Sequence, residues 1–272
     1  MRRGLPTSVG TDSSMTTPLN HGRLRERLHG PDVTVGVFAG LGSVLAAEVA
    51  AASGVDWILV DCEHGASGDD IVSPIVAATG AYGVPTLVRA ESGERIRIGR
   101  ALDAGAAGVM IPRLTSADEV RAAVSHFFYP PRGDRGVATY NRANQWGAEI
   151  SALDGAVHAC AMIQIETRGA LADVDEIASI DGVDMLFVGP LDLSYSLGIP
   201  RQYDHPDFLA ALDSVLVAAN RAGIAAGILA PDAETARRHI DRGFRFIAVS
   251  SDSVLLSAAI RQNVTALKGN TP

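Results

Sequence analysis

Continuous apolar runs recur along the chain and alternate with segments that have helical spacing. The runs cover residues 33–39, 57–63, 85–90, 108–114, 160–166, 185–190, 225–230 and 244–250. An unbroken apolar run is typical of a strand covered on both faces, as in a parallel sheet. The pattern therefore predicts eight buried strands joined by helices.

Helix signals lie between these runs. Residues 116–128 open with Ser116 and carry Glu119 three positions later, which is a capping-box pattern. Residues 231–243 start at a proline and end at a glycine, the usual asymmetry of a helix. Eight β-α units in succession predict an α/β protein with the (β/α)8 TIM-barrel fold, and a doubly wound open sheet is the alternative.

The domain organisation is simple. We expect residues 1–22 to form a flexible N-terminal tail and residues 23–272 to form a single barrel domain. The tail has two arginines but no apolar segment, so it does not have the pattern of a secretory signal. The longest irregular stretch, residues 129–147, lies between the fourth and fifth predicted strands, and loops of that length are usually functional.

Composition narrows the classes of partner and compartment. The chain has 272 residues, 47% of them hydrophobic, and a formal net charge of -8, which allows a sizeable core and disfavours nucleic acid as a partner. No apolar run approaches the roughly 18 residues of a membrane span. The two cysteines, Cys62 and Cys160, lie in strand-like runs, so we expect them to be core residues of a protein in a reducing, cytoplasmic compartment.

Polar residues gather where the predicted strands end. Active sites of (β/α)8 barrels lie at the carboxyl ends of the strands, so these residues should share one rim. They are Asp61, Glu63, His64, Arg89, Pro112, Arg113, Gln164, Glu166 and Asp192.

Two carboxylates at this rim, Glu166 and Asp192, come from neighbouring strands. Carboxylates that approach each other repel unless a positive charge lies between them, and a divalent cation with oxygen ligands is a natural occupant. A structural interpretation is also open. Asp192 would then cap the helix that starts at Leu193, and Glu166 would pair with Arg168.

His64 and Arg89 are the other candidates for chemistry. His64 has no second histidine at ligand spacing, which disfavours zinc. With Asp61 or Asp103 to orient its ring, His64 would serve as a general base, although a structural histidine is equally open. Arg89, flanked by apolar residues, needs an anion, which is either a structural carboxylate or a substrate oxygen. The arginines of the long loop are expected to be solvated: Arg132, Arg135 and Arg142.

Five segments in order resemble one known family. They are VDCEHG, LVRA, YPPRGDRGVATYNRANQW, IQIETRGAL and FVGPLDLSYSLG. Together they resemble the HpcH/HpaI aldolase/citrate lyase family, and within it the metal-dependent 4-hydroxy-2-oxoheptanedioate aldolases. The resemblance runs from about residue 33 to about residue 265 and is specific because five motifs keep their order.

The resemblance implies a role for each matching residue. His64 is the implied acid/base, Asp61 is the aspartate beside it, and Asp103 supports it. Arg89 is the implied stabiliser of the enolate and carbonyl oxygens. The remaining implied roles are substrate contact for Gln164, binding of Mg, Mn or Co for Glu166 and Asp192, and binding of the pyruvate carboxylate for the backbone of Leu191. Many relatives have alanine at the position of Leu191, so the pocket there is expected to differ.

The implied activity is reversible aldol cleavage of 4-hydroxy-2-oxo acids to pyruvate and an aldehyde. The sole lysine, Lys268, lies four residues from the end, which disfavours an imine-forming aldolase. Two alternatives are a lyase acting on CoA thioesters and a non-catalytic barrel scaffold. Family members are hexamers built from dimers that exchange their last helix, and residues 253–269 are apolar enough for that exchange or for ordinary packing.

Overall fold

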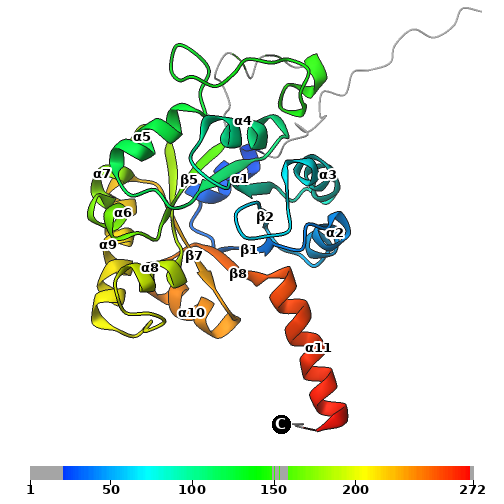
Figure 1. Ribbon diagram of the computed structural model, residues 1–272, viewed down its shortest axis with the longest axis vertical. Coiled ribbons are helices and arrows are strands. Elements are labelled where there is room, and N and C mark those ends of the chain that lie inside the picture. Colours follow the sequence, from blue (N-terminus) through cyan, green and yellow to red (C-terminus); the bar gives the residue numbers. More distant parts are fainter. Residues whose placement is uncertain (1–20, 149, 151–152, 154–158, 270–272) are drawn as a thin grey trace, which may run out of the picture.

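Eight parallel strands close into a barrel in the computed structural model, which describes residues 21–148, 150, 153 and 159–269 (Figure 1). Each strand pairs with the next, and β8 pairs with β1, so the predicted (β/α)8 barrel is confirmed and the open sheet is excluded. The strands are β1 Thr34–Ala39, β2 Trp57–Asp61, β3 Thr86–Arg89, β4 Gly108–Ile111, β5 Cys160–Ile165, β6 Val183–Val188, β7 Ala225–Ala230 and β8 Phe246–Ser251.

Several strand bounds differ from the apolar runs. β4 ends at Ile111 instead of residue 114, because Pro112 has no N–H to donate and Arg113 has a φ of 61°. β8 begins at Phe246 instead of residue 244, although Phe244 is fully buried. β6 begins two residues earlier than predicted, at Val183. Apolarity reports burial, whereas a strand also requires ladder hydrogen bonds.

Helices surround the barrel. They are α1 His21–His29, α2 Val44–Ala52, α3 Asp69–Gly80, α4 Arg95–Asp103, α5 Ala117–Ser125, α6 Arg168–Ala172, α7 Val174–Ala178, α8 Pro190–Ser196, α9 Pro206–Ala222, α10 Ala233–Arg242 and α11 Asp252–Lys268, with the 3-10 helix η1 at Arg142–Gly147. The Ser116 hydroxyl accepts the N–H of Glu119, which confirms the N-cap of α5. α5 ends at Ser125 instead of residue 128, and the buried side chains of Phe127 and Phe128 extended the apparent pattern. α10 is shorter than residues 231–243, since Asp232 is its N-cap.

The barrel interior and the helix layer form separate apolar clusters. The interior cluster includes Trp57, Met162, Phe187 and Phe246, and the rings of Trp57 and Phe246 stack with centroids 4.2 Å apart. Leu24 of α1 is fully buried in this interior cluster, so α1 closes one end of the barrel. The predicted tail 1–22 lies almost wholly outside the described residues, and its last two residues belong to α1.

Both cysteines are buried free thiols, as expected from the sequence. Burial, followed by the charge of nearby carboxylates, raises the pKa of Cys62 to about 12. Burial is likewise the main reason that the pKa of Cys160 rises to about 12. Each thiol therefore stays protonated and unreactive at neutral pH.

The last helix projects from the body of the barrel (Figure 1). α11 contains no buried residue. Its main contacts within the described chain are with β1, α2 and the strand that precedes it, β8. Its exposed apolar side chains are Val254, Leu255, Leu256, Ile260, Val264 and Leu267. The helix is therefore not an ordinary packed eighth helix within one chain. None of the helices in the described ranges has the length and hydropathy needed to cross a membrane.

Candidate active site

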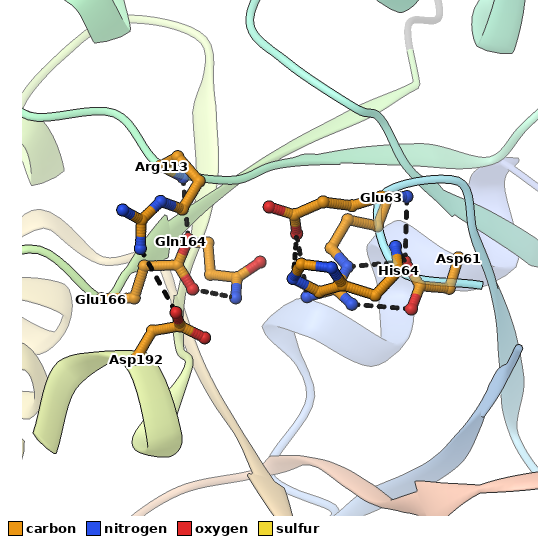
Figure 2. A network of polar contacts seen from close by, with 8 residues as sticks. Asp61, Glu63, His64, Arg113, Gln164, Glu166 and Asp192 are labelled. Carbon is orange, nitrogen blue, oxygen red and sulfur yellow. Dashed lines mark hydrogen bonds and ion pairs between the residues drawn. The ribbon is translucent and has the colours of Figure 1, made fainter. Parts of the chain in front are cut away.

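The polar residues predicted at the rim do converge there (Figure 2). Asp61 ends β2, Arg89 ends β3, and Arg113 follows β4 after one proline. Gln164 lies in β5, and Glu166 follows that strand directly. Asp192 lies in the first turn of α8, which follows β6. The carboxyl ends of parallel strands meet at one edge, which explains why residues far apart in sequence share this site.

A buried ion pair forms the base of one half of the site. Arg89 donates from Nε to Asp61 Oδ1 at 2.9 Å and from Nη2 to Asp61 Oδ2 at 2.7 Å, and each side chain is 8% exposed. The carboxylate of Asp61 also accepts the backbone N–H groups of Glu63 and His64. Burial alone would raise the pKa of Asp61, but Arg89 and these N–H groups outweigh it and hold that pKa below its usual value.

Glu63 connects this ion pair to His64. Its Oε2 lies 3.2 Å from Arg89 Nη1 and 3.6 Å from His64 Nε2. Burial is the largest cause of a raised pKa for Glu63, and the positive charge of Arg89 opposes that effect. The imidazole is 63% exposed, so it is accessible to a substrate.

The predicted supports of the histidine ring differ from what the structure shows. Asp61 bonds to the backbone of His64, and the carboxylate nearest the ring is that of Glu63. Asp103 pairs at 2.8 Å with Arg135 of the long loop instead of with His64. The expectation that Arg135 is solvated was wrong, because the residue is 9% exposed and stacks over the Tyr129 ring.

The other half of the site contains Glu166, Asp192, Gln164 and Arg113 (Figure 2). The backbone N–H of Arg113 donates to Glu166 Oε1 at 2.8 Å, and its Nη1 donates to Asp192 Oδ1 at 3.2 Å. The amide of Gln164 donates to Glu166 Oε2. Glu166 therefore does not pair with Arg168, whose guanidinium donates to the Ser196 carbonyl, and the cap of α8 is Gly189 instead of Asp192.

This second half is short of positive charge. Burial raises the pKa of Glu166 to about 7, and the negative charges of Asp192 and Glu63 add to the rise, while the Arg113 N–H opposes it. Gln164 is buried, and its Oε1 has no hydrogen-bond partner. A cation beside Glu166 and Asp192 would relieve the repulsion between them.

The donor set fits a hard divalent cation with an incomplete protein shell. Among the described residues, no group of three or more histidine, cysteine, aspartate or glutamate side chains converges as a metal site. Two carboxylates would thus be the protein's share, and water or substrate oxygens would supply the remaining ligands. That arrangement suits Mg or Mn better than a closed structural zinc site.

Three further positions complete the comparison with the sequence. Leu191, at the start of α8, is half-exposed beside Asp192. Glu63 and Arg113 were placed at the rim by their strand ends, but no role was assigned to either. An arginine directly after an X-Pro strand end was the only sequence signal for Arg113, and nothing in the sequence shows its positive φ.

Comparison with known proteins finds relatives that are named aldolases. A hydroxypyruvate/pyruvate aldolase of Paraburkholderia phytofirmans is 40% identical, with 92% of this chain and 97% of that protein covered. A 2-keto-3-deoxy-L-rhamnonate aldolase of Escherichia coli is 35% identical over 90% of this chain and 92% of its own length.

A solved structure with the same fold also comes from an aldolase family. The crystal structure of an HpcH/HpaI aldolase/citrate lyase family protein from Burkholderia cenocepacia superimposes with a TM-score of 0.86 at 36% identity, covering 91% of this chain and 99% of that chain. The family model for HpcH/HpaI aldolase/citrate lyase matches residues 34–259. This chain therefore belongs to the HpcH/HpaI aldolase/citrate lyase family.

Proposed function

We propose that this protein is a divalent-metal-dependent aldolase that forms or cleaves 4-hydroxy-2-oxo acids, with pyruvate and an aldehyde as the two fragments. The observation that carries the proposal is the pair of carboxylates, Glu166 and Asp192, which Arg113 links to each other opposite Glu63 and His64. Relatives that are named pyruvate aldolases support the same reaction class.

Glu166 and Asp192 would hold the cation, which would be Mg, Mn or Co. When bound, such a cation supplies Lewis-acid stabilisation of the negative charge that develops on a 2-oxo oxygen. Gln164 fixes the orientation of Glu166 through its amide, and its free Oε1 offers an acceptor for a water molecule or a substrate hydroxyl.

His64 would move the proton. Its exposed imidazole can accept the proton of the substrate's 4-hydroxyl when the C3–C4 bond breaks, and can return it in the synthetic direction. Glu63 beside the ring would stabilise the imidazolium that forms. Asp61 would position His64 by accepting its backbone N–H, and Asp103 would contribute only indirectly, through Arg135 and the long loop.

Arg89 would act mainly through its charge. Three of its nitrogens already contact Asp61 and Glu63, so its position is fixed before the substrate binds. A preorganised cation costs no reorganisation when an enolate oxygen develops charge nearby. The backbone of Leu191, in the first turn of α8, would bind the pyruvate carboxylate, since N–H groups in a first turn have no intrahelical partner.

The position of the sole lysine supports a metal instead of an imine as the electron sink. Lys268 is the last residue of α11, the helix that projects from the body of the barrel (Figure 1). An imine-forming aldolase needs an amine within its pocket.

The test is aldol turnover of the purified protein with pyruvate and a panel of aldehydes, before and after chelation. We expect EDTA to abolish turnover, and Mg, Mn or Co to restore it. Borohydride added with pyruvate should leave the protein unmodified. Full turnover after exhaustive chelation would contradict the proposal, and turnover of malyl-CoA in place of 4-hydroxy-2-oxo acids would favour a thioester lyase.

The exposed apolar side chains of α11 support a further part of the proposal, that subunits exchange this helix in dimers that assemble into a hexamer. Exposed apolar surface of this extent usually marks an interface. Light scattering after size-exclusion chromatography should show a hexamer. Replacing Leu256 and Ile260 by Ser should release smaller species, whereas the same change at the exposed Val217 of α9 should not.

The free thiols support a cytoplasmic location. Cys62 and Cys160 are buried and unpaired, which suits a protein that never meets an oxidising compartment.

A further inference from the structure

Within the described part of the chain, Arg113 is the one residue that donates hydrogen bonds to both candidate metal ligands. Its φ of 61° lies in the left-handed region, which residues with a side chain rarely adopt. This turn directs its backbone N–H at Glu166 Oε1, at 2.8 Å. Strained backbone of this kind is typical of functional sites, where the surrounding structure enforces it.

The two contacts of Arg113 differ in solvent exposure, and therefore in how easily each can be broken. The backbone contact reaches a glutamate that is 1% exposed. The side-chain contact joins Nη1 to Asp192 Oδ1 at 3.2 Å, and these side chains are 59% and 40% exposed. Exposed ion pairs are weak, so the guanidinium can leave Asp192 at little cost.

No substitute for this guanidinium contacts Asp192 among the described residues. Arg89, the other cation of the site, is committed to Asp61 and Glu63. Asp192 and Glu166 interact unfavourably with each other, and Glu63 adds to that repulsion. The guanidinium of Arg113 thus neutralises the charge of Asp192, as a bound divalent cation would.

We propose that Arg113 is a built-in counter-ion of the metal site: its guanidinium neutralises Asp192 until a divalent cation displaces it, while its backbone N–H keeps Glu166 in place. This inference rests on the metal site of the proposed function. Arg113 is a positioning residue by this account. It stabilises the metal-free site and lowers its affinity for metal, so that the bound cation stays exchangeable.

The test compares Arg113→Met with the parent in two measurements, Mn²⁺ binding followed by the electron paramagnetic resonance of free Mn²⁺, and thermal unfolding in EDTA. Arg113→Met should bind Mn²⁺ about threefold to tenfold more tightly, because a competing charge is removed. In EDTA it should unfold at a lower temperature than the parent. Arg113→Lys should fall between the two, since it keeps the charge without the guanidinium geometry.

Two further variants keep the result interpretable. Arg121→Met removes the same charge from ion pairs with Asp118 and Glu176 outside the rim, and should leave Mn²⁺ binding unchanged. Arg113→Gly removes the guanidinium where the left-handed backbone carries no steric cost, and should also bind Mn²⁺ more tightly.

Equal or weaker Mn²⁺ binding by both Arg113→Met and Arg113→Gly would overturn the counter-ion role while the metal site stood. An equal gain in Arg121→Met would overturn it too, since the effect would then be one of net charge. Failure of the parent and every variant to bind Mn²⁺ would instead contradict the proposed function.

Discussion

Each half of the rim contains carboxylates and one arginine, but the negative charges are balanced differently in the two halves. In one half, Asp61 and Arg89 neutralise each other through two hydrogen bonds and are almost fully buried. In the other, Asp192 pairs with the exposed guanidinium of Arg113, and Glu166 accepts only the backbone N–H of that residue and the amide of Gln164. The charges of the first half are balanced within the protein, whereas the second half is completed, in the proposed function, by a bound cation.

The pKa values express this difference. The pKa of Asp61 is lowered although burial opposes the change, whereas burial and nearby carboxylates raise the pKa of Glu166 to about 7. Burial acts on both carboxyl groups, so the bonded partner decides the direction of the shift. A buried carboxyl group without a cationic partner is a candidate for metal binding.

The largest expected effect is that of removing a ligand from the incomplete half. Glu166→Ala should lose Mn²⁺ binding and about 1000-fold in turnover, because a bound cation contributes several kcal/mol of charge stabilisation. His64→Ala, in the other half, should lose turnover but keep Mn²⁺ binding. Calorimetric titration and aldol assays check both variants, with Glu176→Ala on the exposed outer surface as the control. Parent-like Mn²⁺ affinity in Glu166→Ala would show that the ligand is misassigned.

The next largest effect is a difference between the two halves in the free energy of unfolding lost when a carboxylate is neutralised. Asp61→Asn should lower the free energy of unfolding by about 3–5 kcal/mol, since it leaves Arg89 buried with only Glu63 as a charged partner. Asp192→Asn should change it by about 1 kcal/mol or less, because its ion pair is exposed. Urea unfolding in EDTA measures both, and similar losses in the two variants would mean that the halves do not differ in this way.

The incomplete half should contribute a distinct component to the pH dependence of stability. The pKa of Glu166 is near 7 in the folded protein and 4.5 without the fold, so the folded state binds more protons between these values. The resulting stability is complete below pH 4.5 and is lost as the pH rises to 7, by about 3 kcal/mol in the metal-free protein.

Urea unfolding from pH 4.5 to 7.5 in EDTA should show this decline as a difference between the parent and Glu166→Gln, because the lowered pKa of His239 makes stability rise with pH in both proteins. Glu166→Gln should lack that component of the slope, and saturating Mn²⁺ should reverse it, because the metal binds the ionised carboxylate. The same slope in Glu166→Gln and the parent would assign the pH dependence to other groups.

The smallest effect is expected at Leu191, beside Asp192. Leu191→Ala should leave the free energy of unfolding within about 0.5 kcal/mol, since the side chain is half-exposed. It should shift the ratio of kcat/KM values between long and short aldehydes by about tenfold or less, because it removes three carbon atoms beside a candidate metal ligand. Competition between two aldehydes in one reaction measures that ratio directly.

The barrel could be predicted from the sequence because each strand is marked by a local pattern of apolar residues. A continuous apolar run between helical segments predicts a buried parallel strand, and the carboxyl end of each strand then predicts a rim residue. Asp61, Arg89, Glu166 and Asp192 were found in this way. Strand bounds were less certain, since Pro112 ends β4 inside an apolar run.

The partners of these residues could not be read from the sequence. The pairing of Asp103 with Arg135 joins residues 32 positions apart across a loop, and no local pattern encodes it. The link from Arg113 to Glu166 depends on a positive φ and on a separation of 53 residues. Side-chain pairing at this range is a property of the closed barrel and not of any one segment.

The helix that closes one end of the barrel lies outside the eight repeated units. α1 precedes the first strand, yet its Leu24 completes the apolar filling around Met162 and Phe246. A chain that starts at residue 21 keeps the whole of α1. Starting it at residue 31, which keeps every strand, would open the interior to water, so the smallest autonomous unit of this fold is longer than its repeat.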